Sequence, residues 1–88
     1  MSEAMTKIIQ VKIEAFGAIQ RLLPEDLCLQ CTAKSTVADV LENIVQAYPE
    51  AYSLLERCAC AMGEDMMSRT TVLAEDTVIV LLSPVAGG

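Results

Sequence analysis

Apolar and polar residues alternate near the N-terminus in a pattern that predicts two neighbouring strands. Every second residue is aliphatic in residues 7–15, and residues 26–33 repeat the alternation. A period of two is typical of a strand with one buried face. Phe16 and Gly17 end the first segment, and Pro24 begins a turn before the second. Two strands so close in sequence predict a hairpin.

The apolar spacing then changes to that of a helix. Thr36 or Ser35 offers the N-cap, with Asp39 three residues after Thr36 as a capping-box partner. The apolar positions at helical spacing are Val37, Val40, Leu41, Ile44, Val45 and Tyr48. Pro49 should end this helix near Ala47, because a residue before proline avoids helical geometry. Residues 51–57 are expected to form a further short helical turn.

The last third of the chain predicts short strands and a central one. Residues 58–62 form the first, residues 63–65 a turn, and a return strand begins at residues 66–67. Residues 77–82 are apolar on both faces, which favours the centre of a sheet. The order ββαβ(β)β predicts an α+β protein with the ubiquitin-like β-grasp fold, a mixed sheet of four to five strands and one main helix. We expect a single domain over residues 1–88, with residues 83–88 as an extended arm.

Charge and composition narrow the possible partners. Twelve acidic residues stand against six basic ones, a net charge of −6 that repels phosphate backbones and anionic lipids. We therefore expect neither nucleic acid nor a membrane as a partner. A protein with a basic groove is the expected partner. The apolar runs are too short to span a membrane, and the N-terminus does not resemble a secretory signal. We expect a cytoplasmic protein.

The side chains offer little catalytic chemistry. The chain has no histidine, so it lacks the commonest general base. Cys28 and Cys31 are three residues apart, which places them on opposite faces of one strand. Cys58 and Cys60 share a face, but this spacing alone is weak evidence for a metal site. We expect reduced, packed thiols and no metal ion.

Methionines gather around the turn at Gly63. Met62, Met66 and Met67, together with Leu81, are candidates for an apolar docking patch, since methionine adapts well to partner surfaces. An equally simple interpretation is that they close one end of the core.

The C-terminus is the strongest candidate for a reactive group. Gly87 and Gly88 lack side chains, so the end of the chain can enter a narrow channel. Its α-carboxylate has an ordinary pKa of about 3.3–3.7 and is ionised at neutral pH, so it could attack the α-phosphate of a nucleotide. A simpler interpretation is a frayed terminus of small residues.

Three segments carry a resemblance to a known family. They are the ending Ser83-Pro84-Val85-Ala86-Gly87-Gly88, the segment Val11-Lys12-Ile13-Glu14-Ala15-Phe16-Gly17, and the helix opening Thr36-Val37-Ala38-Asp39-Val40-Leu41. These segments resemble the MoaD and ThiS sulfur carriers, particularly the MoaD group of molybdopterin synthase small subunits. The resemblance covers the chain from about Ile8 onward.

The resemblance implies a reaction cycle centred on Gly88. A ubiquitin-activating-type enzyme (MoeB-like) uses ATP to adenylate this glycine, and a sulfur donor converts the adenylate to a thiocarboxylate. The MoaE-like large subunit then uses the sulfur to build the molybdopterin dithiolene. Such a chain binds no permanent cofactor and is not catalytic alone, but completes a sulfurtransferase complex.

The resemblance also assigns roles to neighbouring residues. Gly87 lets the terminus reach the active site, and Phe16 lies on the surface that docks the partners. The arm's entry is lined by Pro84, Val85 and Ala86. Many members have a proline where this chain has Ser83, from which a slightly looser arm is expected. Another difference, Gln20-Arg21 where members often have arginine then glutamate, affects the expected docking details.

Other functions remain open from the sequence. The carrier could deliver sulfur to thiamin, cysteine or tRNA, although ThiS-type carriers are usually shorter and lack the arm that begins at Pro84. A different class is a β-grasp interaction module whose terminal glycines stay unmodified or are joined to lysines of other proteins.

Overall fold

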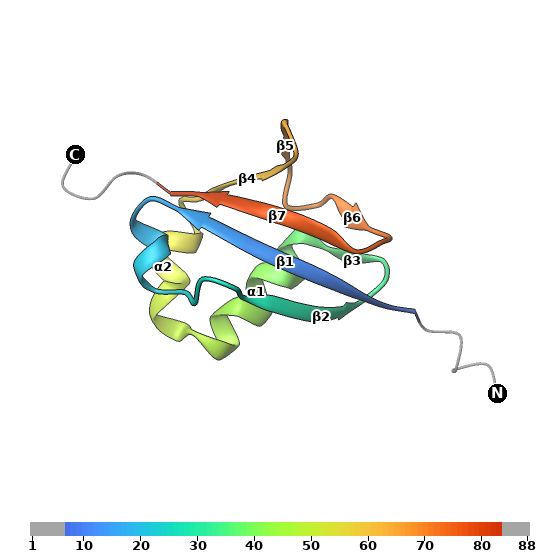
Figure 1. Cartoon of the computed structure of the whole chain (residues 1–88), viewed down its shortest axis with the longest axis horizontal. Helices are drawn as coiled ribbons and strands as arrows, with labels where there is room; N and C mark the ends of the chain where they lie inside the picture. The colour runs from blue at the N-terminus through green and yellow to red at the C-terminus, as the bar shows by residue number, and fades with distance from the viewer. Residues whose placement is uncertain (1–6, 84–88) are drawn as a thin grey trace.

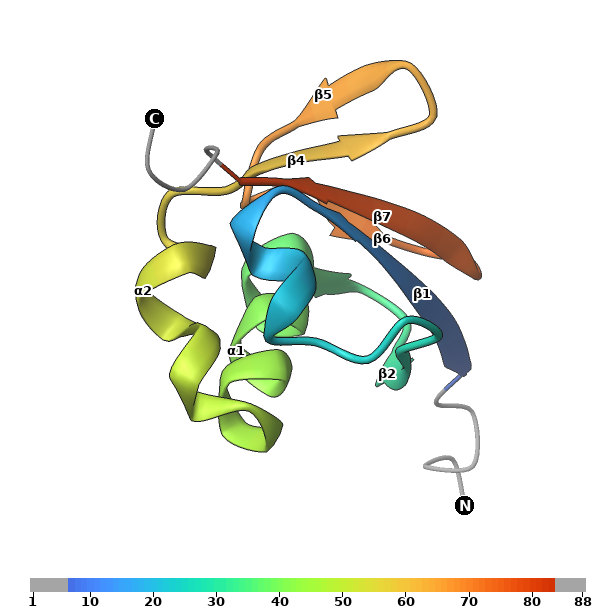
Figure 2. The same cartoon turned by 60° about the vertical axis from the view of Figure 1, so that its left-hand side comes forward.

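The computed structural model describes residues 7–83 and shows a mixed five-stranded sheet with α1 and α2 on one face (Figures 1 and 2). The strands are β1 (Ile8–Phe16), β2 (Cys28–Thr32), β3 (Ser35–Thr36), β4 (Ala59–Met62), β5 (Asp65–Met67), β6 (Val72–Leu73) and β7 (Thr77–Leu82). The helices are α1 (Val37–Ala47) and α2 (Tyr52–Leu55), with 3₁₀ helices η2 (Ala18–Arg21) and η3 (Pro49–Ala51). The sheet order is β2-β1-β7-β4-β5. The predicted α+β class and ubiquitin-like β-grasp fold are confirmed.

The N-terminal hairpin has the predicted register of apolar residues. β1 runs antiparallel to β2, with Ile9 opposite Cys31 and Val11 opposite Leu29. Residues that face each other across a ladder point to the same side of the sheet. Ile9 and Val11 are therefore fully buried beneath α1, while the intervening residues of β1 face away from it.

The main helix begins and ends where the sequence predicts. The Thr36 hydroxyl accepts a hydrogen bond from the Asp39 amide at 3.2 Å, and the Asp39 carboxylate accepts one from the Thr36 amide at 3.0 Å. This reciprocal pair is a capping box. At the other end, Pro49 follows the C-cap and begins η3. The expected further helical turn is present as α2.

The last strand is central, as predicted, but only one of its faces is covered by helices. β7 lies between β1, to which it is parallel, and β4, to which it is antiparallel. Ile79 and Leu81 are fully buried against the helices. Val78 and Leu82 are 39% and 40% exposed on the opposite side. The doubly apolar pattern therefore marks a central strand with one apolar face open to solvent.

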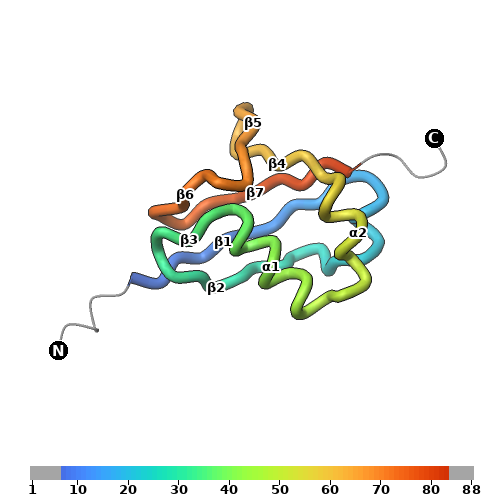
Figure 3. Tube along the Cα trace, turned by 180° about the vertical axis from the view of Figure 1, so that it is seen from behind, coloured from blue at the N-terminus to red at the C-terminus, as the bar shows by residue number. Residues whose placement is uncertain are grey.

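Two short strands were not expected from the sequence. β3 and β6 pair antiparallel as a separate two-stranded sheet, with Ser35 opposite Leu73 (Figure 3). Each has two residues, which is too short to show a period of two. A further hydrogen bond of 2.7 Å, from the Lys34 amide to the Leu73 carbonyl, continues this pairing. The pairing fastens the segment before β7 to the start of α1.

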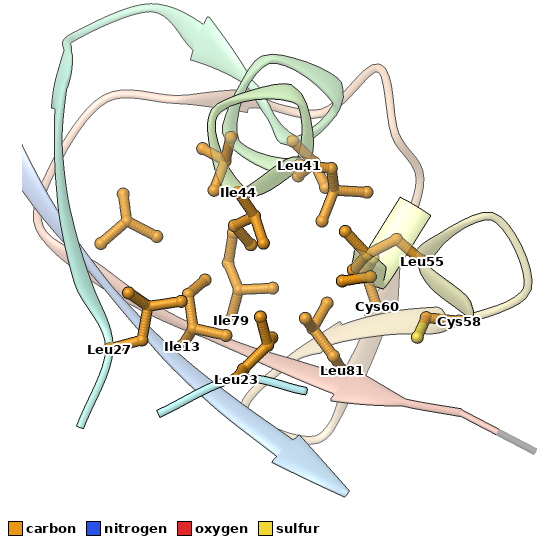
Figure 4. Close-up of a cluster of buried hydrophobic side chains, with 14 of the residues drawn as sticks. Ile13, Leu23, Leu27, Leu41, Ile44, Leu55, Cys58, Cys60, Ile79 and Leu81 are labelled. Carbon is orange, nitrogen blue, oxygen red and sulfur yellow. The ribbon is translucent and has the colours of Figure 1, made fainter. Parts of the chain in front are cut away.

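One apolar core fills the space between the sheet and the helices (Figure 4). Its fully buried members are Ile9, Val11, Ile13, Ile19, Val37, Val40, Ile44, Ile79 and Leu81. Among residues 7–83, no polar or charged side chain is buried. Backbone ladders join the strands, and dispersion and apolar burial hold the helices against the sheet. No helix in the described part of the chain is long and apolar enough to cross a membrane.

Candidate functional site

The predicted reactive end of the chain lies outside the described residues. This applies to Gly88 and Gly87 and to the predicted arm residues Pro84, Val85 and Ala86. The structure describes the segment from which this end emerges, at the end of β7. The site is therefore built from that attachment point and the sheet surface beside it.

Ser83 holds this attachment point with three hydrogen bonds. Its amide donates to the Phe16 carbonyl at 3.0 Å, which extends the parallel ladder between β1 and β7 by one step. Its hydroxyl donates to the same carbonyl at 3.0 Å and accepts from the Ile19 amide at 2.9 Å. The hydroxyl ties Ser83 itself to both β1 and η2. The expectation that serine loosens the arm concerns residues 84–88, which lie outside the described residues, and it stays a prediction.

Gly17 makes this close contact possible. Its φ of +90° lies in the region that residues with a side chain rarely adopt. A Cβ atom at this position would press against the Ser83 carbonyl oxygen and lie 2.6 Å from the Ser83 hydroxyl oxygen. Gly17 therefore serves both the turn after β1 and the close approach of Ser83. The sequence marked it only as the end of a strand.

An apolar surface lies beside Ser83 on the side of the sheet away from the helices, which we call the open face. The Phe16 side chain is 50% exposed there and lies opposite Leu82, which in turn lies opposite Ala59. In the next row, Glu14 of β1 faces Val80, which faces Ala61, which faces the exposed Met66. The open face thus joins apolar residues of four strands. Phe16 is exposed on it, and its role in docking a partner stays a prediction.

Leu81 does not belong to this surface. Its side chain is fully buried in the core, so the expectation that it forms part of an exposed docking patch is wrong. Side chains alternate along a strand, and Leu81 faces the helices while Val80 and Leu82 face outward. The outward-facing leucine at this end of β7 is therefore Leu82.

The predicted methionine cluster is divided between the two sides of the sheet. Met66 lies opposite Ala61 on the open face and is 64% exposed. Met62 is also exposed, but it alternates with Ala61, and its sulfur accepts a hydrogen bond from the Thr77 hydroxyl at 2.8 Å. Met67 lies opposite the buried Cys60 and packs against the core. Of the three, only Met66 extends the apolar surface near Phe16.

The thiols occupy the faces that their spacing predicts. Cys28 is exposed and Cys31 is buried, and Cys58 and Cys60 are both buried. Burial raises the pKa of the Cys58 and Cys60 thiols, and the nearby Arg69 guanidinium opposes part of this rise. These thiols are therefore protonated at neutral pH and are poor nucleophiles. In residues 7–83 there is no group of three histidine, cysteine or acidic side chains able to hold a metal ion.

Arg69 has a structural role that the sequence did not indicate. Its guanidinium donates hydrogen bonds to the carbonyl oxygens of Leu55 and Cys58 at 2.9 and 3.0 Å. A longer contact of 3.4 Å reaches the Glu56 carbonyl. Arg69 therefore joins the end of α2 to the start of β4. No local motif marks an arginine in a loop for this role.

Comparison with known proteins supplies the family. The model of the ThiS family matches residues 13–88, which includes the attachment point and the terminal glycines. No curated protein sequence matches the chain.

Solved structures with this fold include subunits of molybdopterin-converting factors and small archaeal modifier proteins. A protein–protein complex of subunits 1 and 2 of molybdopterin-converting factor from Helicobacter pylori contains a chain with 27% identity and a TM-score of 0.64, covering 91% of this chain and 100% of that one. SAMP1 from Haloferax volcanii has 17% identity and a TM-score of 0.77, covering 90% and 99%. A putative subunit 1 of molybdopterin-converting factor from Pyrococcus furiosus has 17% identity and a TM-score of 0.75, covering 88% and 99%. With a family model matched over most of its length and this fold, the chain belongs to the ThiS family of β-grasp proteins.

Proposed function

We propose that this protein is the sulfur carrier of a molybdopterin synthase. The observation that carries the proposal is the 27% identity to a chain of the Helicobacter pylori molybdopterin-converting factor complex, across the whole of that chain. The family match that continues to Gly88 supports the same conclusion. In this proposal the protein acts in the cytoplasm as a small subunit and has no catalytic activity alone.

The proposed chemistry takes place at the carboxyl group of Gly88. A carboxylate oxygen attacks the α-phosphorus of ATP in the activating enzyme, pyrophosphate leaves, and an acyl-adenylate forms. Sulfide then attacks the carbonyl carbon and displaces AMP. The product is a terminal thiocarboxylate, whose sulfur passes to the pterin precursor in the complex with the large subunit.

The open face is the proposed docking surface for both partners. It is apolar along β7, β4 and β5, where it includes Leu82 and Met66, and Phe16 joins it from the end of β1. This apolar part continues directly into Ser83, where the tail begins. A partner bound there would have the tail's starting point at the edge of its interface. The net charge of −6 favours partners whose binding groove is basic, because complementary charge accelerates association.

A second candidate function is that of a protein modifier. The fold is shared with SAMP1, the small archaeal modifier protein 1 of Haloferax volcanii. In that case a lysine amine of another protein, instead of sulfur, attacks the carbonyl carbon of the same adenylate and displaces AMP, and an isopeptide bond results. Carriers for other sulfur-requiring pathways share the thiocarboxylate step and differ only in the acceptor.

Intact mass spectrometry separates these functions. The chain is incubated with ATP, a MoeB-like activating enzyme and a sulfide source, and we expect a mass gain equal to the exchange of one oxygen atom for sulfur. Addition of the large subunit and the pterin precursor should return the chain to its original mass and yield molybdopterin. Conjugates to lysines without a thiocarboxylate would support the modifier, and an unchanged mass with several activating enzymes would contradict both.

A matched pair of extensions tests the role of the terminus. One glycine added after Gly88 should abolish the mass gain, because the carboxylate is then displaced by one residue. One glycine added before Met1 should leave the mass gain unchanged. Both variants should unfold thermally at the wild-type temperature.

A further inference from the structure

The Ser83 hydroxyl supplies a cap that η2 cannot obtain from its own sequence. The first amides of a helix have no partner within that helix. Gly17 occupies the N-cap position of η2 and has no side chain to accept a hydrogen bond. The Ile19 amide is instead bonded at 2.9 Å to Ser83, which is 64 residues away in the sequence. This pairing joins the first turn after β1 to the last residue of the described chain.

The hydroxyl both donates and accepts a hydrogen bond in this arrangement. A serine hydroxyl has one donor hydrogen and can also accept. Here the hydrogen goes to the Phe16 carbonyl at 3.0 Å, and a lone pair receives the Ile19 amide. Both bonded groups belong to the backbone, which has no freedom to rotate away as a surface side chain has. Together with the Ser83 amide, these bonds form what we call the Ser83 latch.

The latch fixes the residue from which the C-terminal tail begins. Five residues, 84–88, follow Ser83 to the terminus. Such a segment spans at most about 18 Å when extended, so the position of Ser83 sets the region that the terminal carboxylate can reach. A misplacement of about 1 Å can reduce a reaction rate about a hundredfold when reacting groups must meet in a fixed geometry.

We propose that Ser83 is a positioning residue for the terminal carboxylate. This inference rests on the proposed function. The latch fixes the starting point of the tail relative to the open face. It therefore raises the fraction of docked molecules in which the Gly88 carboxylate reaches the α-phosphorus of ATP. Docking itself depends on Phe16 and its apolar neighbours, so it should be independent of the latch.

The test compares two serine-to-alanine variants. Ser83→Ala removes two of the three latch hydrogen bonds and keeps the one from the amide. Ser35→Ala is the control, because it also removes one partly exposed serine hydroxyl that is hydrogen bonded, in this case to Thr32 at 3.3 Å. Ser35 lies on β3, away from the end of β7 (Figure 1). Each variant is measured for thermal unfolding and for affinity to the activating enzyme. ATP–pyrophosphate exchange by that enzyme then gives kcat and the KM for the variant chain.

For Ser83→Ala we expect kcat to fall about tenfold or more, with affinity and KM within about twofold of wild type. Ser35→Ala should match wild type in all three kinetic and binding values. A purely structural role for Ser83 would lower the unfolding temperature but leave kcat at the wild-type value, and that result would overturn the proposal. Gly17→Ala disturbs the latch from the other side and should reduce kcat in the same way if it folds.

A measurement without any partner tests the latch itself. Hydrogen exchange of the Ile19 amide should be about tenfold faster in Ser83→Ala, while amides of the β1–β7 ladder exchange at the wild-type rate. Unchanged Ile19 exchange would overturn the latch whatever the kinetics show. If the wild-type chain is not adenylated by any activating enzyme, the proposed function fails and the positioning role fails with it, even where Ile19 exchange shows the hydrogen bond.

Discussion

At the scale of single residues, the buried thiols link stability to pH. Burial raises the pKa of Cys31, Cys58 and Cys60, because the low-polarity interior disfavours thiolate. Arg69 opposes this effect for Cys58 and Cys60 without reversing it. The folded chain therefore holds these protons more tightly than the unfolded chain. Such groups stabilise the fold fully below the thiol pKa of the unfolded chain, and this contribution is lost as the pH rises through the folded pKa.

We predict that the chain loses stability above a pH of about 8.5, the ordinary pKa of an unfolded thiol. The measurement is the urea midpoint of unfolding at about pH 7 and about pH 9.5, in the presence of a reductant. Cys58→Ala/Cys60→Ala should be less stable at neutral pH, because two buried side chains are truncated, but should lose less between the two pH values. Cys28→Ala is the control, since this side chain is exposed and should leave the pH dependence unchanged. An equal loss in all three proteins would contradict the prediction.

At the scale of elements, the N-terminus of α1 is satisfied by local and distant partners together. The third helical amide, that of Asp39, is bonded to the Thr36 hydroxyl. The first two, of Val37 and Ala38, donate to the carbonyls of Thr71 and Arg69 at 3.0 and 2.9 Å. These carbonyls belong to the loop between β5 and β6. The loop therefore completes the cap and is held against the helix by it.

We predict that Thr36→Ala lowers the free energy of unfolding by about 1 kcal/mol, the usual cost of removing an N-cap hydroxyl. Thr36→Ser should retain most of the stability, because serine can accept the same hydrogen bond from the Asp39 amide. Thr32→Ala is the matched control: its hydroxyl bonds only the Ser35 hydroxyl on the surface, and its loss should cost less than about 0.5 kcal/mol. Urea denaturation gives the three values, and an equal cost at Thr32 would show that the cap contributes nothing specific.

Features with a short period could be predicted from the sequence, and contacts between distant loops could not. The hairpin and the capping box depend on residues two or three positions apart, so the pattern itself contains them. The run Val78-Ile79-Val80-Leu81-Leu82 is apolar throughout, so no polar residue shows which members face the core. That is why Leu81 was placed on the surface and Leu82 was overlooked.

The latch of Ser83 and the bonds of Arg69 show the second limit. Each joins a side chain to backbone atoms more than ten residues away. Backbone amides and carbonyls are the same whatever the amino acid, so the partner residue has no recognisable type. Composition and spacing carry no signal for such contacts. The sequence could identify the terminal glycines as a candidate site, but not what holds the chain in front of them.

At the scale of the whole molecule, an apolar surface and an acidic charge act at different distances. The net charge of −6 acts over about one Debye length, roughly 8–10 Å at physiological salt. The apolar residues of the open face act only on contact. β1 and β7 are parallel and end at the same edge, so Phe16 and Leu82 lie beside the starting point of the tail (Figure 1). In the proposed function, a partner attracted by charge would be oriented by this apolar end of the sheet.

This division predicts separate effects of mutation and salt. Phe16→Ala should weaken binding to the activating enzyme and to the large subunit about thirtyfold, or about 2 kcal/mol, because aromatic anchors dominate interfaces. The fold should be little affected, since the side chain is already 50% exposed.

Ile8→Ala is the matched control on the same face at the other end of β1, where a similarly exposed aliphatic side chain should contribute nothing to binding. Calorimetry gives the affinities, and stopped-flow mixing at low and high salt gives the association rates, which should fall with salt equally in wild type and Phe16→Ala. Equal losses at Phe16 and Ile8 would mean that the partners do not bind at the end of the sheet where the tail begins.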